Sequence, residues 1–277
     1  MNERTKKIVF LLLFVLLFVC VFFFIKEGNR LLTKGYNLNF FSFEFELPDN
    51  LPSGDSAFVP TSVKGKLYWK SHYSISYSDS DRLSEWVAYE LTCSELEKSA
   101  GRDGKRFEQD KTVTNGVRHY EYKNSGYDRG HLAPAADMAF SEEAMTQSFL
   151  MSNIAPQLPS FNRGIWSKLE NQVRGYVRDK GALYIVTGCC WDEASRRIGE
   201  TEIPVPAYYY KVLFDTNTKS SGMIVFLFPH GELRNSIFDY VVTVDSLESL
   251  TSVDFFHQLP DNLESELESQ VRTRLWK

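Results

Sequence analysis

The most informative part of the chain is YDRGHLAPAADM at residues 127–138, followed by SNIAPQLPSFNRGIWSKLE at residues 152–170. In the first segment an arginine stands two residues before a histidine, and Gly130 between them lets the backbone turn sharply. This spacing brings a permanent cation next to a base that titrates near neutral pH, an arrangement that suits phosphate chemistry. Arg129 and His131 are therefore the first candidates for a functional site. Either residue alone is more often an ordinary surface group, so the second segment has to support this interpretation.

The second segment leads into an amphipathic helix that we expect over residues 164–180. At about 100° per residue, its apolar side chains form one core-facing stripe: Trp166, Leu169, Val173 and Val177. Glu170 falls inside that stripe, and so does Asn162 by extrapolation back from the helix. Such polar groups must be paired or bind a ligand, because burying them unsatisfied costs roughly 2–7 kcal/mol. Either Asn162 caps the helix and Glu170 pairs with an arginine, or the two residues serve one metal site.

Together, the two segments resemble the DRGH-type DNA/RNA non-specific endonucleases, which are ββα-metal nucleases. The resemblance extends over about 200 residues, roughly from Tyr68 to Leu263, and includes expected strands near residues 86–89, 186–188 and 206–214. It implies an Mg²⁺-dependent endonuclease that hydrolyses both DNA and RNA to 5′-phosphate ends, with Mn²⁺ as a substitute ion.

The resemblance also implies a role for each polar residue of the two segments. His131 would be the general base, Asn162 the direct metal ligand, and Glu170 the acceptor that holds metal-bound water. Arg129 would bind or orient the phosphate, and Asn153 would support the site near the base and the metal. A neutral amide suits Mg²⁺, because this ion binds oxygen and keeps several of its waters.

Further arginines are candidates for substrate contacts. The family's additional transition-state arginine lies upstream of the DRGH block, where Arg106 is the better match and Arg102 is the alternative. Residues 163–180 carry five basic and two acidic side chains, which predicts a local basic face. Within this stretch we expect Arg163 and Arg174 to bind substrate phosphates.

The chain as a whole is acidic, with a net charge of −5 from 31 basic and 36 acidic residues. Residues 239–268 contain eight acidic residues and no lysine or arginine, which we interpret as a solvated surface. The sequence has no zinc-finger spacing and no RNA-recognition or DNA-reading signature. Contacts should therefore go mainly to phosphates, and cleavage should be independent of the bases. The alternative is a catalytically silent, membrane-anchored nucleic-acid receptor, against which the complete set of candidate catalytic residues argues.

The N-terminus predicts a membrane anchor. Residues 8–25, IVFLLLFVLLFVCVFFFI, are 18 consecutive apolar residues, or about 27 Å of helix. Basic residues precede this run and no small-residue cleavage site follows it. We expect residues 1–7 in the cytoplasm, a single-pass signal anchor over residues 8–25, and the catalytic domain on the periplasmic or extracellular side of a bacterial envelope. If the anchor is cleaved, the enzyme is secreted.

The remaining sequence predicts one α+β domain. Residues 26–62 carry prolines without a helical period and are expected to form a stalk, and residues 63–277 the nuclease domain. The expected strands are residues 73–77, 86–91, 182–188, 208–214 and 223–228; the expected helices are residues 141–152, 164–180, 243–251 and 263–274. Their irregular alternation predicts a largely antiparallel central sheet flanked by helices. The family resemblance adds a ββα-metal core at the active site.

The cysteines leave two redox states open. In an oxidising compartment, Cys93 could form a disulfide with either Cys189 or Cys190 and leave one thiol unpaired. The sequence is equally compatible with three free thiols.

Overall fold

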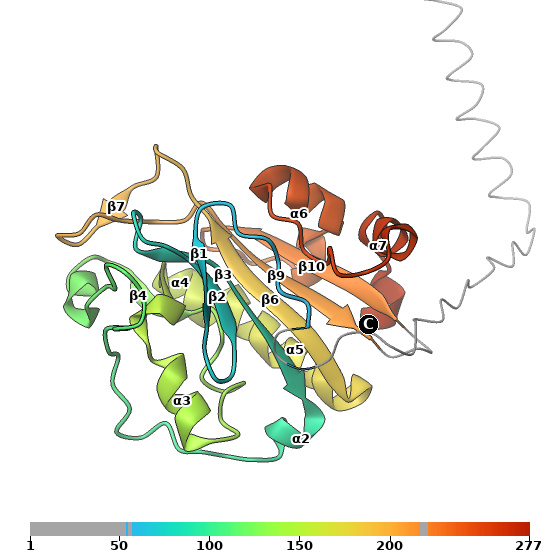
Figure 1. Cartoon of the computed structure of the whole chain (residues 1–277), viewed down its shortest axis with the longest axis horizontal. Coiled ribbons are helices and arrows are strands. Elements are labelled where there is room, and N and C mark those ends of the chain that lie inside the picture. Colours follow the sequence, from blue (N-terminus) through green and yellow to red (C-terminus); the bar gives the residue numbers. More distant parts are fainter. Residues whose placement is uncertain (1–53, 55–56, 217–220) are drawn as a thin grey trace, which may run out of the picture. The chain divides into compact units, whose positions relative to one another are not determined.

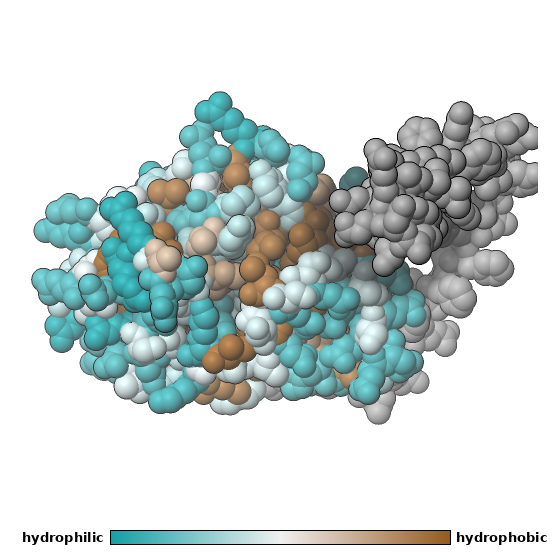
Figure 2. Space-filling model, turned by 90° about the horizontal axis from the view of Figure 1, so that it is seen from above, coloured by the Kyte–Doolittle hydropathy of each residue, from teal (hydrophilic) through white to brown (hydrophobic). Residues whose placement is uncertain are grey.

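The computed structural model describes residue 54, residues 57–216 and residues 221–277. The expected cytoplasmic segment, the signal anchor of residues 8–25 and most of the expected stalk lie outside these residues. Among the residues that are described, no helix is long and apolar enough to cross a membrane. Figure 2 shows that the described surface on one face is mostly hydrophilic, with hydrophobic residues gathered near its middle.

A seven-stranded sheet in which all neighbouring strands are antiparallel forms the centre of the domain (Figure 1). This confirms the expected α+β architecture, and each of the five expected strands is present. In spatial order the strands are β1 (Lys66–Trp69), β2 (Ser74–Ser78), β3 (Leu83–Thr92), β6 (Ala182–Cys190), β9 (Tyr208–Asp215), β10 (Gly222–Pro229) and β11 (Val241–Val242). Two short ribbons lie outside this sheet: β4 (Asp128–His131) with β5 (Ile154–Gln157), and β7 (Arg197–Ile198) with β8 (Ile203–Pro204).

Helices pack on both faces of the sheet. The α-helices are α2 (Cys93–Leu96), α3 (Glu142–Ser148), α4 (Pro159–Phe161), α5 (Ser167–Lys180), α6 (Val244–Thr251) and α7 (Asp261–Glu268). The 3₁₀ turns are η1 (His119–Tyr122), η2 (Met151–Asn153), η4 (Ile237–Tyr240) and η5 (Thr273–Trp276), and η3 (Asn162–Trp166) is a π-helical turn.

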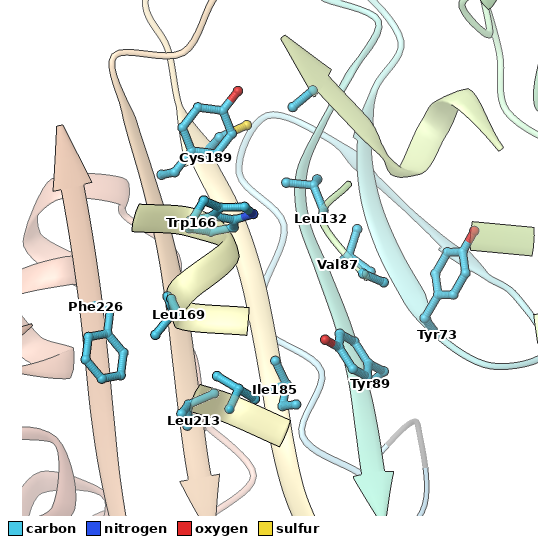
Figure 3. Packing of buried hydrophobic residues seen from close by; sticks show 14 of the residues in the cluster. Tyr73, Val87, Tyr89, Leu132, Trp166, Leu169, Ile185, Cys189, Leu213 and Phe226 are labelled. Carbon is cyan, nitrogen blue, oxygen red and sulfur yellow. The ribbon is translucent and has the colours of Figure 1, made fainter. Parts of the chain in front are cut away.

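The alternation of side chains along the strands divides the interior into two cores. On β9, for example, Tyr209 and Leu213 join the core beneath α5, whereas Val212 and Phe214 join the core beneath α6 and α7. Because successive strand residues point to opposite faces, one strand serves both cores. Figure 3 shows side chains of α5 and η3 packed over the strands of the first core.

Two of the expected helices end earlier than the sequence pattern suggests. The helix expected to reach residue 152 ends at Ser148, and the turn η2 then leads directly into β5. The helix expected over 263–274 ends at Glu268. Its continuation forms η5 instead, because this places Trp276 in the core with its ring 5.1 Å from that of Tyr176.

The expected boundary between stalk and domain at residue 63 is wrong. Ala57, Phe58 and Val59 are buried in the core beneath α6 and α7. The ring of Phe58 lies 4.7 Å from that of Tyr184 and 5.2 Å from that of Phe214. An apolar segment of this kind is stabilised by burial, so the domain begins no later than residue 57.

Cys93, Cys189 and Cys190 are free thiols. The antiparallel pairing of β3 with β6 sets Thr92 opposite Ala182 and Trp86 opposite Gly188, so Cys93 and the adjacent pair lie near opposite ends of these strands. At about 3.4 Å per residue, the register sets Cys93 roughly 27 Å from Cys189 along the strands, far beyond the reach of a disulfide.

Candidate active site

The DRGH sequence is itself a strand, β4, and its partner is β5 from the second decisive segment. Gly130 pairs with Ala155, and His131 pairs with Ile154. A Cβ at position 130 would lie 2.2 Å from the side chain of Gln157, so a larger residue there would require the buried Gln157 side chain to move. Leu132, which directly follows the histidine, is fully buried and lies near Val87 of the central sheet (Figure 3). The ribbon is thereby attached to the core at the residue next to His131.

His131 lies in an aromatic environment. Its ring centroid is 5.4 Å from that of Phe107 and 5.3 Å from that of Phe149. Burial, together with the positive charge of Arg102, lowers the pKa of His131 to about 3. Its Nε2 is buried without a hydrogen-bond partner. The imidazole is therefore neutral at physiological pH and has a ring nitrogen to offer to a substrate or water.

Asn153 connects the end of β4 to the helical segment before β5. Its buried side chain accepts a hydrogen bond from the backbone N–H of Ala133 (2.8 Å) and donates to the carbonyls of Ala133 and Ser148 (both 2.9 Å). Its own carbonyl accepts from the N–H of Leu132 (2.9 Å). These bonds hold the backbone of the two residues that follow His131. Asn153 is therefore placed to position His131.

Asn162 begins the π-helical turn η3 and does not cap α5. Within this turn Gly164 has φ −99° and ψ −112°, so the helical angle extrapolated back from α5 does not apply to Asn162. Its Nδ2 donates to Oδ2 of Asp128 (3.0 Å). Its Oδ1 has no hydrogen-bond partner within the described part of the chain. π-helical turns inside helices are frequent at functional sites, and this one directs an amide toward the DRGH strand.

Asp128, the first residue of DRGH, holds two of the candidate residues. Its carboxylate accepts from Asn162 and also from Arg163, through Nε (2.9 Å) and Nη2 (2.7 Å). Although burial opposes the effect, the bonds from Arg163 and Asn162 lower the pKa of Asp128. Arg163, expected as a phosphate contact, already holds a carboxylate in this structure.

Glu170 lies within a cluster of buried charges. Burial raises the pKa of Glu170 above its ordinary value, Asp137 adds to this effect, and Lys211 opposes it. Lys211 of β9 is fully buried, and burial lowers the pKa of its ammonium group. Its Nζ donates to the hydroxyl of Thr187 and lies 5.4 Å from the ring centroid of Trp166.

Asp137 and Arg174 complete this cluster. Asp137 accepts from the hydroxyl of Tyr89 (2.7 Å) and from Nη1 of Arg174 (2.8 Å). Arg174, expected as a phosphate contact, thus holds a buried carboxylate, and it also donates to Asn171. The sequence analysis assigned no role to Asp137 or Lys211. For Lys211 the signal was a lysine within the apolar strand YYYKVLF, where an isolated charge has to be compensated.

The two upstream arginines, Arg102 and Arg106, and the arginine of the DRGH strand, Arg129, lie in two different settings. The guanidinium carbon of Arg102 is 5.3 Å from the ring centroid of Phe149, and its charge acts on both His131 and Glu170. Arg129 donates from Nε (3.1 Å) and Nη2 (3.0 Å) to the carbonyl of His119. Arg106 lines a pocket together with Arg129. The structure therefore brings Arg102, and not Arg106, close to His131.

Comparisons with known proteins agree with this architecture. The sequence profile of the DNA/RNA non-specific endonuclease family matches residues 56–262. A nuclease from Nostoc sp. is 35% identical over 233 residues, which cover 79% of this chain and 83% of the relative. A nuclease from Syncephalastrum racemosum is 31% identical over 217 residues, which cover 70% and 68%. A chain in the crystal structure of the EndoG/EndoGI complex superimposes with a TM-score of 0.66 at 27% identity, covering 72% of this chain and 89% of that one.

The fold and the site define a nuclease built on a neutral histidine beside arginines and amides. The chain belongs to the DNA/RNA non-specific endonuclease family and is a hydrolase of that class.

Proposed function

We propose that the enzyme cleaves phosphodiester bonds of both DNA and RNA without sequence preference, depends on Mg²⁺ and leaves 5′-phosphate ends. The observation that carries this proposal is the buried, unpartnered Nε2 of a neutral His131 on the DRGH strand. A neutral imidazole with a free nitrogen is the form that a general base requires.

The residues around His131 suit a hydrated divalent cation. Asn162 is held by its amide nitrogen, which leaves the amide oxygen as a ligand. Glu170, in the first turn of α5, offers a carboxylate oxygen. Oxygen donors of this kind match Mg²⁺, with Mn²⁺ as a possible substitute. When bound, Mg²⁺ supplies positive charge that stabilises the developing negative charge on the phosphate.

The protein's own residues remove the proton from the attacking water and stabilise charge as the P–O3′ bond breaks, and the leaving O3′ takes its proton from solvent water. His131 accepts a proton from the attacking water, and Asn153 holds the chain next to it in place. Arg129 and Arg102 stabilise charge on the phosphate. We assign the transition-state role to Arg102 instead of Arg106, because Arg102 is the arginine whose charge reaches both His131 and Glu170. Arg163 and Arg174 support this site through Asp128 and Asp137, and either one binds substrate only by exchanging its carboxylate for a phosphate.

We also propose that residues 8–25 anchor the enzyme to a membrane as a single span, with the catalytic domain on the extracytoplasmic side. The support is the uninterrupted apolar run and the basic residues before it. Fractionation of cells with antibody against the catalytic domain tests this: full-length chain in the membrane fraction is expected. A shortened chain in the medium would instead identify a cleaved secretion signal.

Incubation of the full chain, purified in detergent, with supercoiled plasmid and with single-stranded RNA tests the proposed reaction. Degradation of both substrates is expected with Mg²⁺ and not with EDTA, and 5′-end labelling should find phosphates on the products. Binding of both nucleic acids without any cleavage would support the silent receptor instead.

A further inference from the structure

A pocket of about 610 Å³ opens beside the DRGH strand. Among its lining residues are Arg129 from β4, His119 from η1, and Arg106, Phe107 and Lys111 from the loop before η1. This volume lies within the range of about 300–1,000 Å³ that is usual for small-molecule sites. The pocket is therefore large enough for a nucleotide-sized ligand.

The charge of the pocket is positive and partly uncompensated. Four of its lining residues are basic, and Glu108 is the acidic one. Lys105 is paired with Glu142, and Arg129 is bonded to a backbone carbonyl. Arg106 and Lys111 are exposed, and neither forms a hydrogen bond or ion pair with any residue that the structure describes. These two cations are available to an anionic ligand.

Phe107 connects the pocket to the catalytic base. The guanidinium carbon of Arg129 lies 5.3 Å from the centroid of the Phe107 ring, and the His131 ring lies 5.4 Å from the same centroid. The pocket is thus separated from His131 by about one aromatic ring. A polyanion cleaved at His131 extends beyond the base in both directions, and this pocket adjoins the base through the Phe107 ring.

We infer that this pocket is a subsite for the nucleotide next to the scissile phosphodiester, in which Arg106 and Lys111 bind the neighbouring phosphate. This inference rests on the proposed function. It gives Arg106 a role in holding the strand, at a distance from the bond that is cleaved. Because phosphates carry no sequence information, the subsite favours longer substrates without favouring any base.

The test compares a substrate that reaches the pocket with one that does not. A single-stranded hexanucleotide carries neighbouring phosphates, whereas bis(4-nitrophenyl) phosphate is a diester with none. The variant is full-length Arg106→Ala/Lys111→Ala enzyme, and the quantity compared is kcat/KM for the hexanucleotide divided by kcat/KM for the small diester. We expect this ratio to fall about tenfold or more, because interactions with charged groups are individually strong. The fall should come chiefly from a higher KM for the hexanucleotide. The salt dependence of hexanucleotide binding should become less steep by about 0.7 for each phosphate that the variant no longer binds.

A matched control removes two lysines that lie outside the pocket. Lys66 and Lys98 are both exposed, and Lys66→Ala/Lys98→Ala changes the net charge by the same amount. This control should keep the wild-type substrate ratio and salt slope. If Arg106→Ala/Lys111→Ala keeps them too, the subsite is overturned. Failure of the wild-type enzyme to cleave either substrate would overturn the proposed function instead, so the two failures are distinguishable.

Discussion

The two faces of the central sheet are built on different principles. The core beneath α6 and α7 is apolar and aromatic, and Phe58, Phe214 and Phe256 pack there edge to face. The core beneath α5 is the larger of the two, and it contains the buried charges of Lys211 and Asp137. Among the described residues, the charges on the first face include acidic side chains of α6 and α7, of which Glu268 is buried.

This difference shows where the protein accepts a cost in stability. Burying an ion pair costs several kcal/mol of desolvation, and hydrophobic residues of the same volume often give equal or greater stability. Such charges are therefore informative where they occur. Here they lie directly behind Glu170, on the face that carries the candidate active site, which is where perturbed pKa values tend to gather.

The largest expected effect is the loss of turnover in His131→Ala, on the side of the sheet that carries the candidate active site. Loss of a general base lowers turnover by about 10²–10⁴-fold, and the exposed His257, outside the site, provides the control His257→Ala. Initial rates of plasmid and RNA cleavage at saturating Mg²⁺ measure both. Retention of more than about a tenth of wild-type activity by His131→Ala would sink the assignment of the base.

The second expected effect compares neighbouring residues of β9 that face opposite cores. Lys211→Met removes one partner of a buried charge cluster and should lower the free energy of unfolding by about 3–5 kcal/mol. Val212→Ala, on the apolar side, should lower it by about 1–3 kcal/mol through reduced burial and a small cavity. Urea unfolding followed by circular dichroism measures both values. A Lys211→Met protein as stable as the wild type would show that these charges do not compensate one another.

A smaller effect concerns the acidic margin of the apolar face. Burial raises the pKa of Glu268 to about 8, and the carboxylates of Glu248, Glu264, Asp245 and Asp254 contribute. Because this folded-state pKa lies above the unfolded value, its contribution to stability is complete below the unfolded pKa and is lost as pH rises through about 8. The melting temperature of the wild type should therefore fall between pH 6 and pH 9, by about 2–4 °C for each kcal/mol of stability that is removed.

Glu268→Gln should remove most of that decline, whereas the exposed Glu193 offers the control Glu193→Gln, which should keep it. Thermal melts at several pH values measure the difference. Parallel curves for the wild type and Glu268→Gln would contradict the account.

The smallest effect distinguishes the two candidate arginines. Burial is the main cause of the low pKa of His131, and the charge of Arg102 contributes to it. Arg102→Gln should therefore raise this pKa, so that more of the base is protonated in acid. The pKa of His131, followed by NMR titration of its ring, should rise in Arg102→Gln and stay constant in Arg106→Gln. The opposite result would return the catalytic role to Arg106.

Local patterns predicted most of the secondary structure correctly. The alternation in β9 and β10 and the turn-rich connector between them predicted an antiparallel hairpin, and the stripe from Trp166 to Val177 is buried as expected. The same approach failed where an element is stabilised by distant partners. The segment at residues 57–59 has no strand or helix pattern, yet it is held in place by rings from β6 and β9.

The candidate site, too, was predictable from the sequence only where local patterns identify its residues. Residue types and spacing singled out His131, Asn162 and Glu170 as candidates, because polar groups within an apolar stripe require a partner or a ligand. The family resemblance then supplied the role expected of each. The choice between Arg102 and Arg106 depends on which side chain approaches the Phe149 ring and His131 in space. Lys211 is 41 residues from Glu170 and 74 from Asp137 along the chain, and only the packing of β9 against α5 brings these charges together. Sequence by itself therefore indicated most of the elements, which follow from local periodicity, and the candidate site residues, which follow from residue type and family resemblance. The tertiary structure decided which charges meet, because buried electrostatic interactions depend on distance and desolvation and not on separation along the chain.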